Sequence, residues 1–317
     1  MQPMNVVIDC DTGVDDAMAL LLALRSPEFN VVGVTNVAGN VPLNKVVRNT
    51  LVVVEHARRQ VPVYPGASRP MVRPSGTAEY AHGSDGLGDV GFPDPVSKPQ
   101  SIHAVDFLVQ TFAEATEPLH LITLGPLTNI GIALARAPEL ERQIASLVMM
   151  AGGINGGNTT PAAEFNVWVD PEAADIVFSS SIPNKTMVAL DPIRQGGGIY
   201  SEDVEQFEAA GTPWCDMLGR LLRKRLTMMA QMFGDVRPTT PPDLAAVGVA
   251  LDPTIACAAS LPVRIETEGR YTRGMTVVDQ REFRRGPWAE IEPNINVVQT
   301  IDNARYRKLV LDRVLAQ

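Results

Sequence analysis

The sequence predicts an α/β protein in which helices cover both faces of an open, mostly parallel central sheet. Three observations indicate this class. Short strand-like runs are apolar throughout, as at residues 6–8, or apolar except for one serine, as at residues 144–150, which is typical of strands buried on both faces. Helix-like stretches follow these runs in alternation. Polar residues come directly after the runs, and the carboxyl ends of parallel strands are where such sheets bind ligands.

The alternation of strands and helices holds over the first two thirds of the chain. We expect strands at residues 6–8, 31–35, 119–124, 144–150 and 186–190, and helices at residues 17–24, 43–59, 130–137 and 171–179. Asp191 then follows the last of these strands. The final third is less regular, with helical stretches at residues 213–233 and 243–251 and a hairpin of residues 263–267 and 275–279.

The domain organisation follows from length and composition. The chain has 317 residues, of which 45% are hydrophobic, and this length allows either one α/β domain or two domains. No Ser/Gly-rich linker, charge block, low-complexity tract or internal repeat separates two halves. We therefore expect one domain that spans residues 1–317, with its active site at the carboxyl ends of the strands.

The charge and the cysteines limit the possible partners and compartments. A formal net charge of −9 argues against nucleic acid and anionic membranes as partners, since both favour basic surfaces. The first residues contain no basic region, and no apolar stretch approaches the ~18 residues of a membrane span. Three cysteines lie far apart without C-x-x-C spacing, which favours a reducing compartment and no structural disulfide. We expect a soluble, cytoplasmic protein.

Four aspartates lie within eight residues after the first strand: Asp9, Asp11, Asp15 and Asp16. Capping of the following helix would explain one or two of them. Four carboxylates this close repel one another unless a cation lies among them, and Gly13 permits the tight turn that would fold them together. Oxygen ligands suit Ca²⁺ or Mg²⁺. The segment therefore predicts a divalent metal site.

Two other metal-using patterns fit this segment less well. An EF-hand loop needs glycine at its sixth position and glutamate at its twelfth, where this segment has Val14 and Leu20. A haloacid-dehalogenase-like phosphohydrolase, which is Mg²⁺-dependent, also begins with D-x-D after a strand, and Asp9 would be its nucleophile. That pattern leaves Asp15 and Asp16 unexplained. A phosphohydrolase of this kind remains the alternative enzyme.

An ordered set of motifs resembles the nucleoside hydrolases of the inosine-uridine preferring family. The motifs run from about Asn5 to beyond Asp252, and each alone is weakly specific. They are D-x-D-x-G-x-D-D at residues 9–16, Asn40, G-P-L-T-N at residues 125–129, G-G at 152–153, G-N at 157–158, A-E-F-N at 163–166, D-P-E-A at 170–173 and Asp243.

The resemblance implies hydrolysis of the N-glycosidic bond of ribonucleosides to ribose and free base, a reaction of purine and pyrimidine salvage. It implies that Ca²⁺ is held by Asp11, Asp16, Asp243 and the backbone carbonyl of Leu124, with Asp11 as general base on a metal-bound water. It also implies ribose binding by Asp15, Asn40, Asn158, Glu164 and Asn166. Family members form homodimers or homotetramers, so we expect one of these states.

Some assignments need their own argument. Glu164 and Asn166 are two residues apart, so in an extended segment both side chains would point the same way. His82 lies in a glycine-rich loop and matches a family histidine near the base, although an ordinary loop histidine or a lid would look the same. We take Asn129 as structural and expect Asp9 to support the metal loop.

The resemblance fails at Pro242. Many inosine-uridine-type members carry histidine there, proposed to help the base leave, and purine-specific relatives carry tryptophan. The leaving-group acid and the base preference therefore stay open. Candidate substitutes are His82, Trp168, Trp214, Arg237 and the helix that carries Met228, Met229, Met232 and Phe233. The missing group also motivates a non-catalytic alternative, a protein that binds nucleosides without cleaving them.

Overall fold

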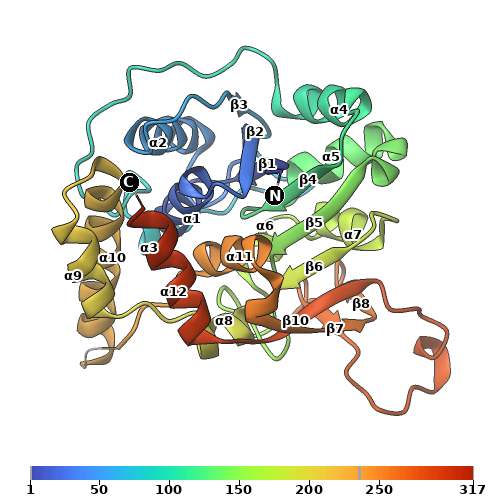
Figure 1. Ribbon diagram of the computed structural model, residues 1–317. Coiled ribbons are helices and arrows are strands. Elements are labelled where there is room, and N and C mark those ends of the chain that lie inside the picture. The colour runs from blue at the N-terminus through green and yellow to red at the C-terminus, as the bar shows by residue number, and fades with distance from the viewer. Residues whose placement is uncertain (1, 235–236, 317) are drawn as a thin grey trace.

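A computed structural model describes residues 2–234 and 237–316. Its central sheet has the strand order β3-β2-β1-β4-β5-β6-β10-β7 (Figure 1). All neighbouring strands run parallel except the antiparallel edge pair of β10 and β7. The strands are β1 (Met4–Cys10), β2 (Phe29–Asn36), β3 (Val63–Pro65), β4 (Leu119–Thr123), β5 (Ile144–Met150), β6 (Lys185–Val188), β7 (Ala256–Leu261) and β10 (Ile295–Ile301). The predicted fold class is confirmed.

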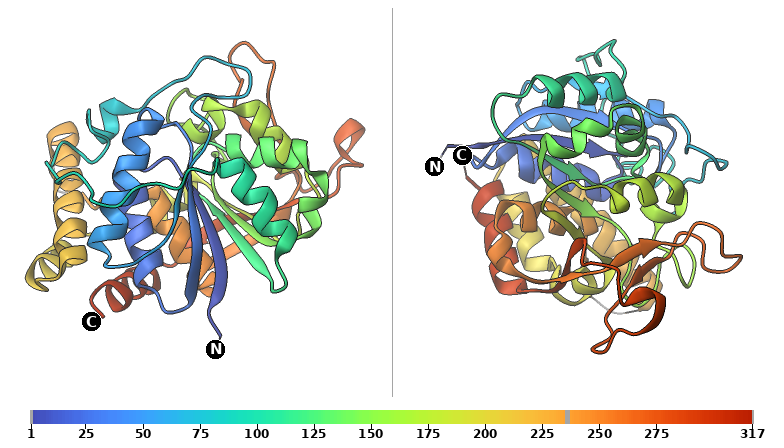
Figure 2. Two further views of the ribbon diagram at one scale, coloured as in Figure 1. Left: turned by 90° about the horizontal axis from the view of Figure 1, so that it is seen from above. Right: turned by 90° about the vertical axis from the view of Figure 1, so that its right-hand side faces the viewer.

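Helices cover both faces of the sheet (Figure 2). One face carries α1 (Val14–Arg25), α2 (Leu43–His56), α11 (Pro242–Leu251) and α12 (Asn303–Val314), and the other carries α4 (Ala104–Glu114), α5 (Thr128–Arg136) and α7 (Pro171–Ser179). Each face has its own hydrophobic core. Helix α1 is buried almost completely, because α2 and α11 pack beside it.

The remaining elements lie at the edges of this core. They are α3 (Glu79–His82), α6 (Phe165–Val169), α8 (Leu190–Gly196), α9 (Ser201–Ala209), α10 (Pro213–Phe233) and three 3₁₀ helices (Pro138–Arg142, Pro253–Ile255 and Gly286–Trp288). A separate hairpin of β8 (Val263–Ile265) and β9 (Thr276–Val278) confirms the predicted pair, although both strands are shorter than expected.

Within the two described ranges, no helix combines the length and apolarity that crossing a membrane needs.

The structure corrects two predicted boundaries. The strand expected at residues 186–190 ends at Val188, and Leu190 begins α8, so Asp191 lies in a first helical turn. Pro192 suits that turn, since it has no N–H to satisfy. The helix expected at residues 43–59 ends at His56, and the positive φ of 51° at Arg58 does not fit a helix.

Candidate functional site

The loops after neighbouring strands meet around one cavity. In the sheet register, Cys10 pairs with Asn36 and Asp9 with Thr123, so the segments after β1, β2 and β4 leave the sheet side by side. The cavity has a volume of about 80 Å³. Most of the predicted site residues line it: Asp15, Asn40, His82, Leu124, Asn158, Glu164, Asn166 and Asp243. Asp11 and Asp16 are fully buried and contact these lining residues.

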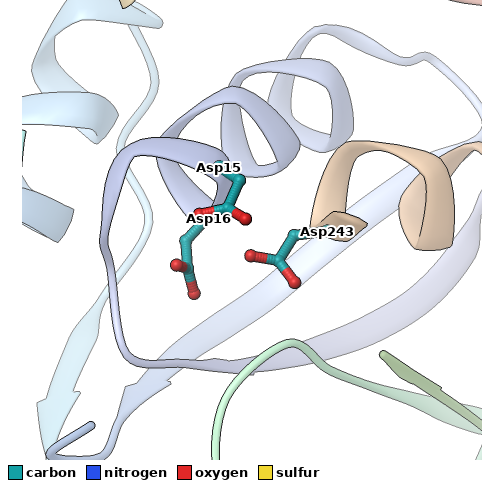
Figure 3. Close-up of side chains that lie close together, drawn as sticks. All are labelled: Asp15, Asp16 and Asp243. Atoms are coloured by element: carbon teal, nitrogen blue, oxygen red, sulfur yellow. The ribbon is translucent and has the colours of Figure 1, made fainter. Parts of the chain in front are cut away.

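Three carboxylates converge at the floor of this cavity. Oxygen atoms of Asp15, Asp16 and Asp243 lie within 4.8 Å of one another. Figure 3 shows Asp15 and Asp16 at the start of α1 and Asp243 at the start of α11, around a common space. Two helix N-termini thus point into the cluster, and their dipoles favour negative charge there. Sequence reasoning grouped Asp11, rather than Asp15, with the other two carboxylates.

Asp11 lies next to the cluster in a narrow space. Its Oδ2 accepts a hydrogen bond from the backbone N–H of Asn40 at 2.7 Å, and its own N–H donates to Asp16 Oδ1 at 3.2 Å. Its Oδ1 is buried without a hydrogen-bond partner among the described residues. A Cβ atom at Gly39 would lie 2.1 Å from Asp11 Oδ2, and one at Gly125 would lie 2.7 Å from Oδ1. Glycine at both positions therefore makes room for the carboxylate.

This close approach makes Gly39 a sensitive position. We expect Gly39→Ala to displace the Asp11 carboxylate and lower kcat by about 10²-fold, since a shift of about 1 Å can have that effect. Gly198→Ala is the matched control, because its added Cβ would meet its neighbours only at 3.4 Å or more. Steady-state kinetics and thermal unfolding of both variants test this. Normal kcat in a folded Gly39→Ala variant would show that the site tolerates a shifted Asp11.

The acidic cluster is electrostatically unfavourable on its own. Burial raises the pKa of Asp11 and of Asp243 well above the usual range, and the charge of Asp16 raises both further. Burial, followed by the charge of Asp15, raises the pKa of Asp16 to about 7. Buried like charges need a compensating cation. Unpartnered oxygens at Asp11 Oδ1 and Asp15 Oδ1 offer the hard ligands that such a cation prefers. These residues therefore fit a divalent metal ion.

The raised pKa values predict how pH affects the cation-free protein. Burial raises the pKa of Asp9 and Asp16 from 3.8 to about 7. Between these values the folded state holds protons that the unfolded chain has lost, so the free energy of unfolding falls as pH rises through this window. Chelated protein should thus show a lower Tm at about pH 8 than at about pH 5, and added Ca²⁺ should remove the decline. A cation-free Tm that increases over this interval would contradict the electrostatic account.

Asp9 has a supporting position outside the cavity. It is fully buried, and its Oδ1 accepts hydrogen bonds from Thr35 at 2.5 Å and from Asn129 at 2.8 Å. Asn129 also donates to the Asn36 carbonyl and accepts from the Ala67 N–H, which ties the first two strand-end loops to α5. These hydrogen bonds place Asp9 as a support for the loops around the cavity, as expected from the sequence.

The opposite wall of the cavity is formed around α6. Glu164 caps this helix, accepting from the N–H groups of Asn166 and Val167, and its Oε2 also accepts from Gly152 N at 2.9 Å. The expectation of an extended segment at residues 164–166 is therefore wrong. Both side chains still face the cavity, because Glu164 turns back over the helix start.

The Leu124 carbonyl and Asn158 also have defined partners. Asn166 Nδ2 donates to the Leu124 carbonyl at 2.7 Å. A carbonyl oxygen has two lone pairs, so this hydrogen bond leaves one for a cation. Asn158 Oδ1 accepts from the Phe165 N–H at 2.9 Å, which leaves its amide NH₂ to face the cavity. The geometry is thus compatible with the Leu124 carbonyl as a cation ligand and with Asn158 as a ribose-binding residue.

His82 is buried at the edge of the cavity. The backbone N–H of Val14 donates to its Nδ1 at 3.1 Å, so Nδ1 carries no proton and Nε2 carries the only one. Burial lowers the pKa of His82, partly opposed by Asp15 and assisted by Arg225. The 3.4 Å separation of Nδ1 and Asp15 Oδ1 is therefore not an ion pair. A neutral imidazole can donate a hydrogen bond to the nucleobase of a substrate, but it is a poor acid for protonating that nucleobase as it leaves.

Among the other suggested substitutes for the missing histidine, Met228 lines a neighbouring cavity, whereas both tryptophans and Arg237 are absent from the lining of the first cavity. Trp214 is buried with its Nε1 bonded to the Val314 carbonyl at 2.9 Å, and Arg25 lies over its ring. Arg237 is exposed, and Trp168 packs beside Phe165. The structure instead brings Tyr80 to the cavity wall, a residue that sequence reasoning missed. No local pattern marked it, since its position depends on how α3 folds back over the strand ends.

Comparison with known proteins gives consistent matches. The family model described as inosine-uridine preferring nucleoside hydrolase matches residues 6–308. The pyrimidine-specific ribonucleoside hydrolase RihA of Citrobacter koseri is 38% identical over 310 residues, which cover 98% of this chain and 97% of that protein.

Solved structures agree with these sequence matches. The purine-preferring ribonucleoside hydrolase from Gardnerella vaginalis has a TM-score of 0.89 at 30% identity and covers 98% of both chains. A plant nucleoside hydrolase, the PpNRh1 enzyme, has the same TM-score of 0.89 at 29% identity, over 99% of this chain and 100% of that one.

Proposed function

Because this chain belongs to the inosine-uridine preferring nucleoside hydrolase family and is a ribonucleoside hydrolase, we propose that Ca²⁺ is its cofactor and Asp11 its general base. The observation that carries the proposal is the group of buried carboxylates at the carboxyl ends of the strands, with unpartnered oxygens on Asp11 and Asp15. Such a group is stable as anions only around a cation.

The donor set favours Ca²⁺. Asp11, Asp16, Asp243 and the Leu124 carbonyl would hold the ion, and Asp15 lies close enough to contribute. Ca²⁺ accepts six to eight oxygen ligands and backbone carbonyls among them, whereas Mg²⁺ prefers fewer protein ligands and keeps several waters. When bound, the cation orients a water molecule and lowers its pKa.

Asp11 is placed to accept a proton through one defined atom. The Asn40 N–H occupies Oδ2, so Oδ1 is the oxygen that remains for the attacking water. A carboxylate beside a cation-oriented water can accept its proton in the reaction. The water oxygen would then add to C1′ of the ribose as the N-glycosidic bond breaks.

The ribose would be held by side chains that are already fixed. Asn40 Nδ2 donates to Asp16 Oδ2 at 3.0 Å, and the Asn158 and Glu164 side chains are held by the backbone bonds described above. We propose that Asp15, Asn40, Asn158, Glu164 and Asn166 bind the sugar hydroxyls and that His82 faces the base. Carboxylates around the sugar also favour the oxocarbenium character that develops at C1′.

Pyrimidine ribonucleosides are the first substrates that we propose, because the relative with 38% identity is described as pyrimidine-specific. Purine nucleosides come second, on the likeness to the purine-preferring enzyme. The single domain of residues 1–317, the homodimer or homotetramer, the cytoplasmic location and the role in salvage stay predictions from the sequence.

The test is the product balance in phosphate-free buffer with Ca²⁺. Uridine, cytidine, inosine, adenosine and guanosine are each incubated with the protein, and free base and reducing sugar are measured. We expect equal amounts of base and ribose. Tight binding of a nucleoside without ribose release would instead support the non-catalytic alternative.

A further inference from the structure

A second cavity adjoins the first across α3. It lies between α3 and the second half of α10 and has a volume of about 330 Å³. Tyr80 and Ala81 line both cavities, so the two spaces share a wall. Tyr80 is 77% exposed and offers an aromatic surface at this boundary. A substrate whose ribose occupies the first cavity would extend toward this second space.

Arg225 lies at the junction of the two cavities. It lines the second cavity, while its Nη1 is 4.0 Å from Oδ2 of Asp15, which lines the first. Its side chain is 15% exposed, and its Nε donates to Thr239 Oγ1 at 3.0 Å. Among residues 2–234 and 237–316, Nη1 and Nη2 have no hydrogen-bond acceptor. The largely buried guanidinium of Arg225 therefore has N–H donors on Nη1 and Nη2 available beside the first cavity.

The reaction needs such a donor. When the N-glycosidic bond breaks, its electron pair stays on the base, which leaves as an anion unless it is protonated or stabilised. Pro242 has no donor, and His82 is neutral. A guanidinium is charged at any working pH and donates in a planar fork. Its attraction to a developing anion is strong where water is excluded.

We propose that Arg225 donates a hydrogen bond to the departing base and stabilises its negative charge. The acceptor would be a ring nitrogen or carbonyl oxygen, such as the 2-oxo group of a pyrimidine. In this scheme the water gives its proton to Asp11 and its oxygen to C1′, the base keeps the electron pair of the broken bond, and the base then takes a proton from solvent. The inference rests on the proposed function.

The test compares two leaving groups in the cation-loaded enzyme. Uridine has a poor leaving group, whereas 4-nitrophenyl β-D-riboside releases an anion that is already stable. We expect Arg225→Met to lower kcat/KM for uridine by about 10²-fold, and for the nitrophenyl riboside by no more than about threefold. Arg225→Lys, which keeps the charge, should recover part of the uridine activity and guards against a folding defect in Arg225→Met.

Arg223→Met is the matched control on the same helix. Arg223 pairs with Glu208 at 2.6 Å and lines neither cavity, so both substrates should be cleaved normally. Equal losses on the two substrates in Arg225→Met would overturn the inference, since Arg225 would then only position Asp15. Wild-type protein that cleaves neither substrate would overturn the proposed function, and this inference with it.

Discussion

Replacing Asp11 with asparagine should lower kcat by at least about 10³-fold, because general bases contribute about 10²–10⁴-fold and Asp11 is also one of the proposed cation ligands. The amide has the shape of the carboxylate and can still accept the Asn40 N–H, but it cannot take a proton. Ribose release from saturating uridine measures the effect.

The fold should survive this substitution. Burial raises the pKa of Asp11 well above its usual range. In the cation-free folded state at neutral pH, Asp11 must therefore bind a proton that the unfolded chain has lost or hold an unfavourable buried charge. Asp11→Asn removes this cost and should raise the Tm after chelation. Asp106→Asn is the control, since Asp106 lies exposed on α4, where it pairs with Arg136 of α5. An Asp11→Asn enzyme with near-normal turnover would exclude Asp11 as the base.

The second large effect is expected at Asp243. Its carboxylate reaches Asp15 and Asp16 from a different helix, so it would complete the proposed cation site across the junction of α1 and α11. We expect Asp243→Asn to weaken Ca²⁺ binding by at least about 10²-fold, since even residues outside the ligand set change metal affinity by 10–100-fold. Isothermal titration with CaCl₂ measures this without reference to turnover.

Asp252→Asn provides the matched control for this titration. Asp252 lies at the opposite end of the same helix, where it caps the 3₁₀ helix Pro253–Ile255. Its substitution should leave Ca²⁺ affinity unchanged. Equal affinity in the Asp243→Asn variant and the control would show that Asp243 is not a ligand.

Much of the fold could be predicted because the information is local. The run of residues 6–8 is apolar, and the aspartates after it mark where β1 ends and α1 begins. Strand β10 was not predicted, although its sequence INVVQTI is rich in β-branched residues. It pairs with β6, more than a hundred residues earlier, and such a long-range neighbour leaves no mark in a local pattern.

The site was predictable for a related reason. Asp11 and Asn40 are predicted as site residues by motif, and they come together because the ends of the parallel strands β1 and β2 meet there. Asp243 is also predicted by motif, but it reaches the same place from the start of α11. The helix cap formed by Glu164 depends on a turn that alternation could not reveal. Arg225 was missed because it sits within a long helix, where periodicity gives no sign of a contact with Asp15.

The most direct test of the account is ribose release from uridine and inosine before and after removal of bound cation. We predict that chelation abolishes release, that Ca²⁺ restores it, and that Asp11→Asn shows none in either state. Undiminished ribose release from protein shown to be free of divalent cation would contradict the central claim, namely that the buried carboxylates act through a bound metal ion.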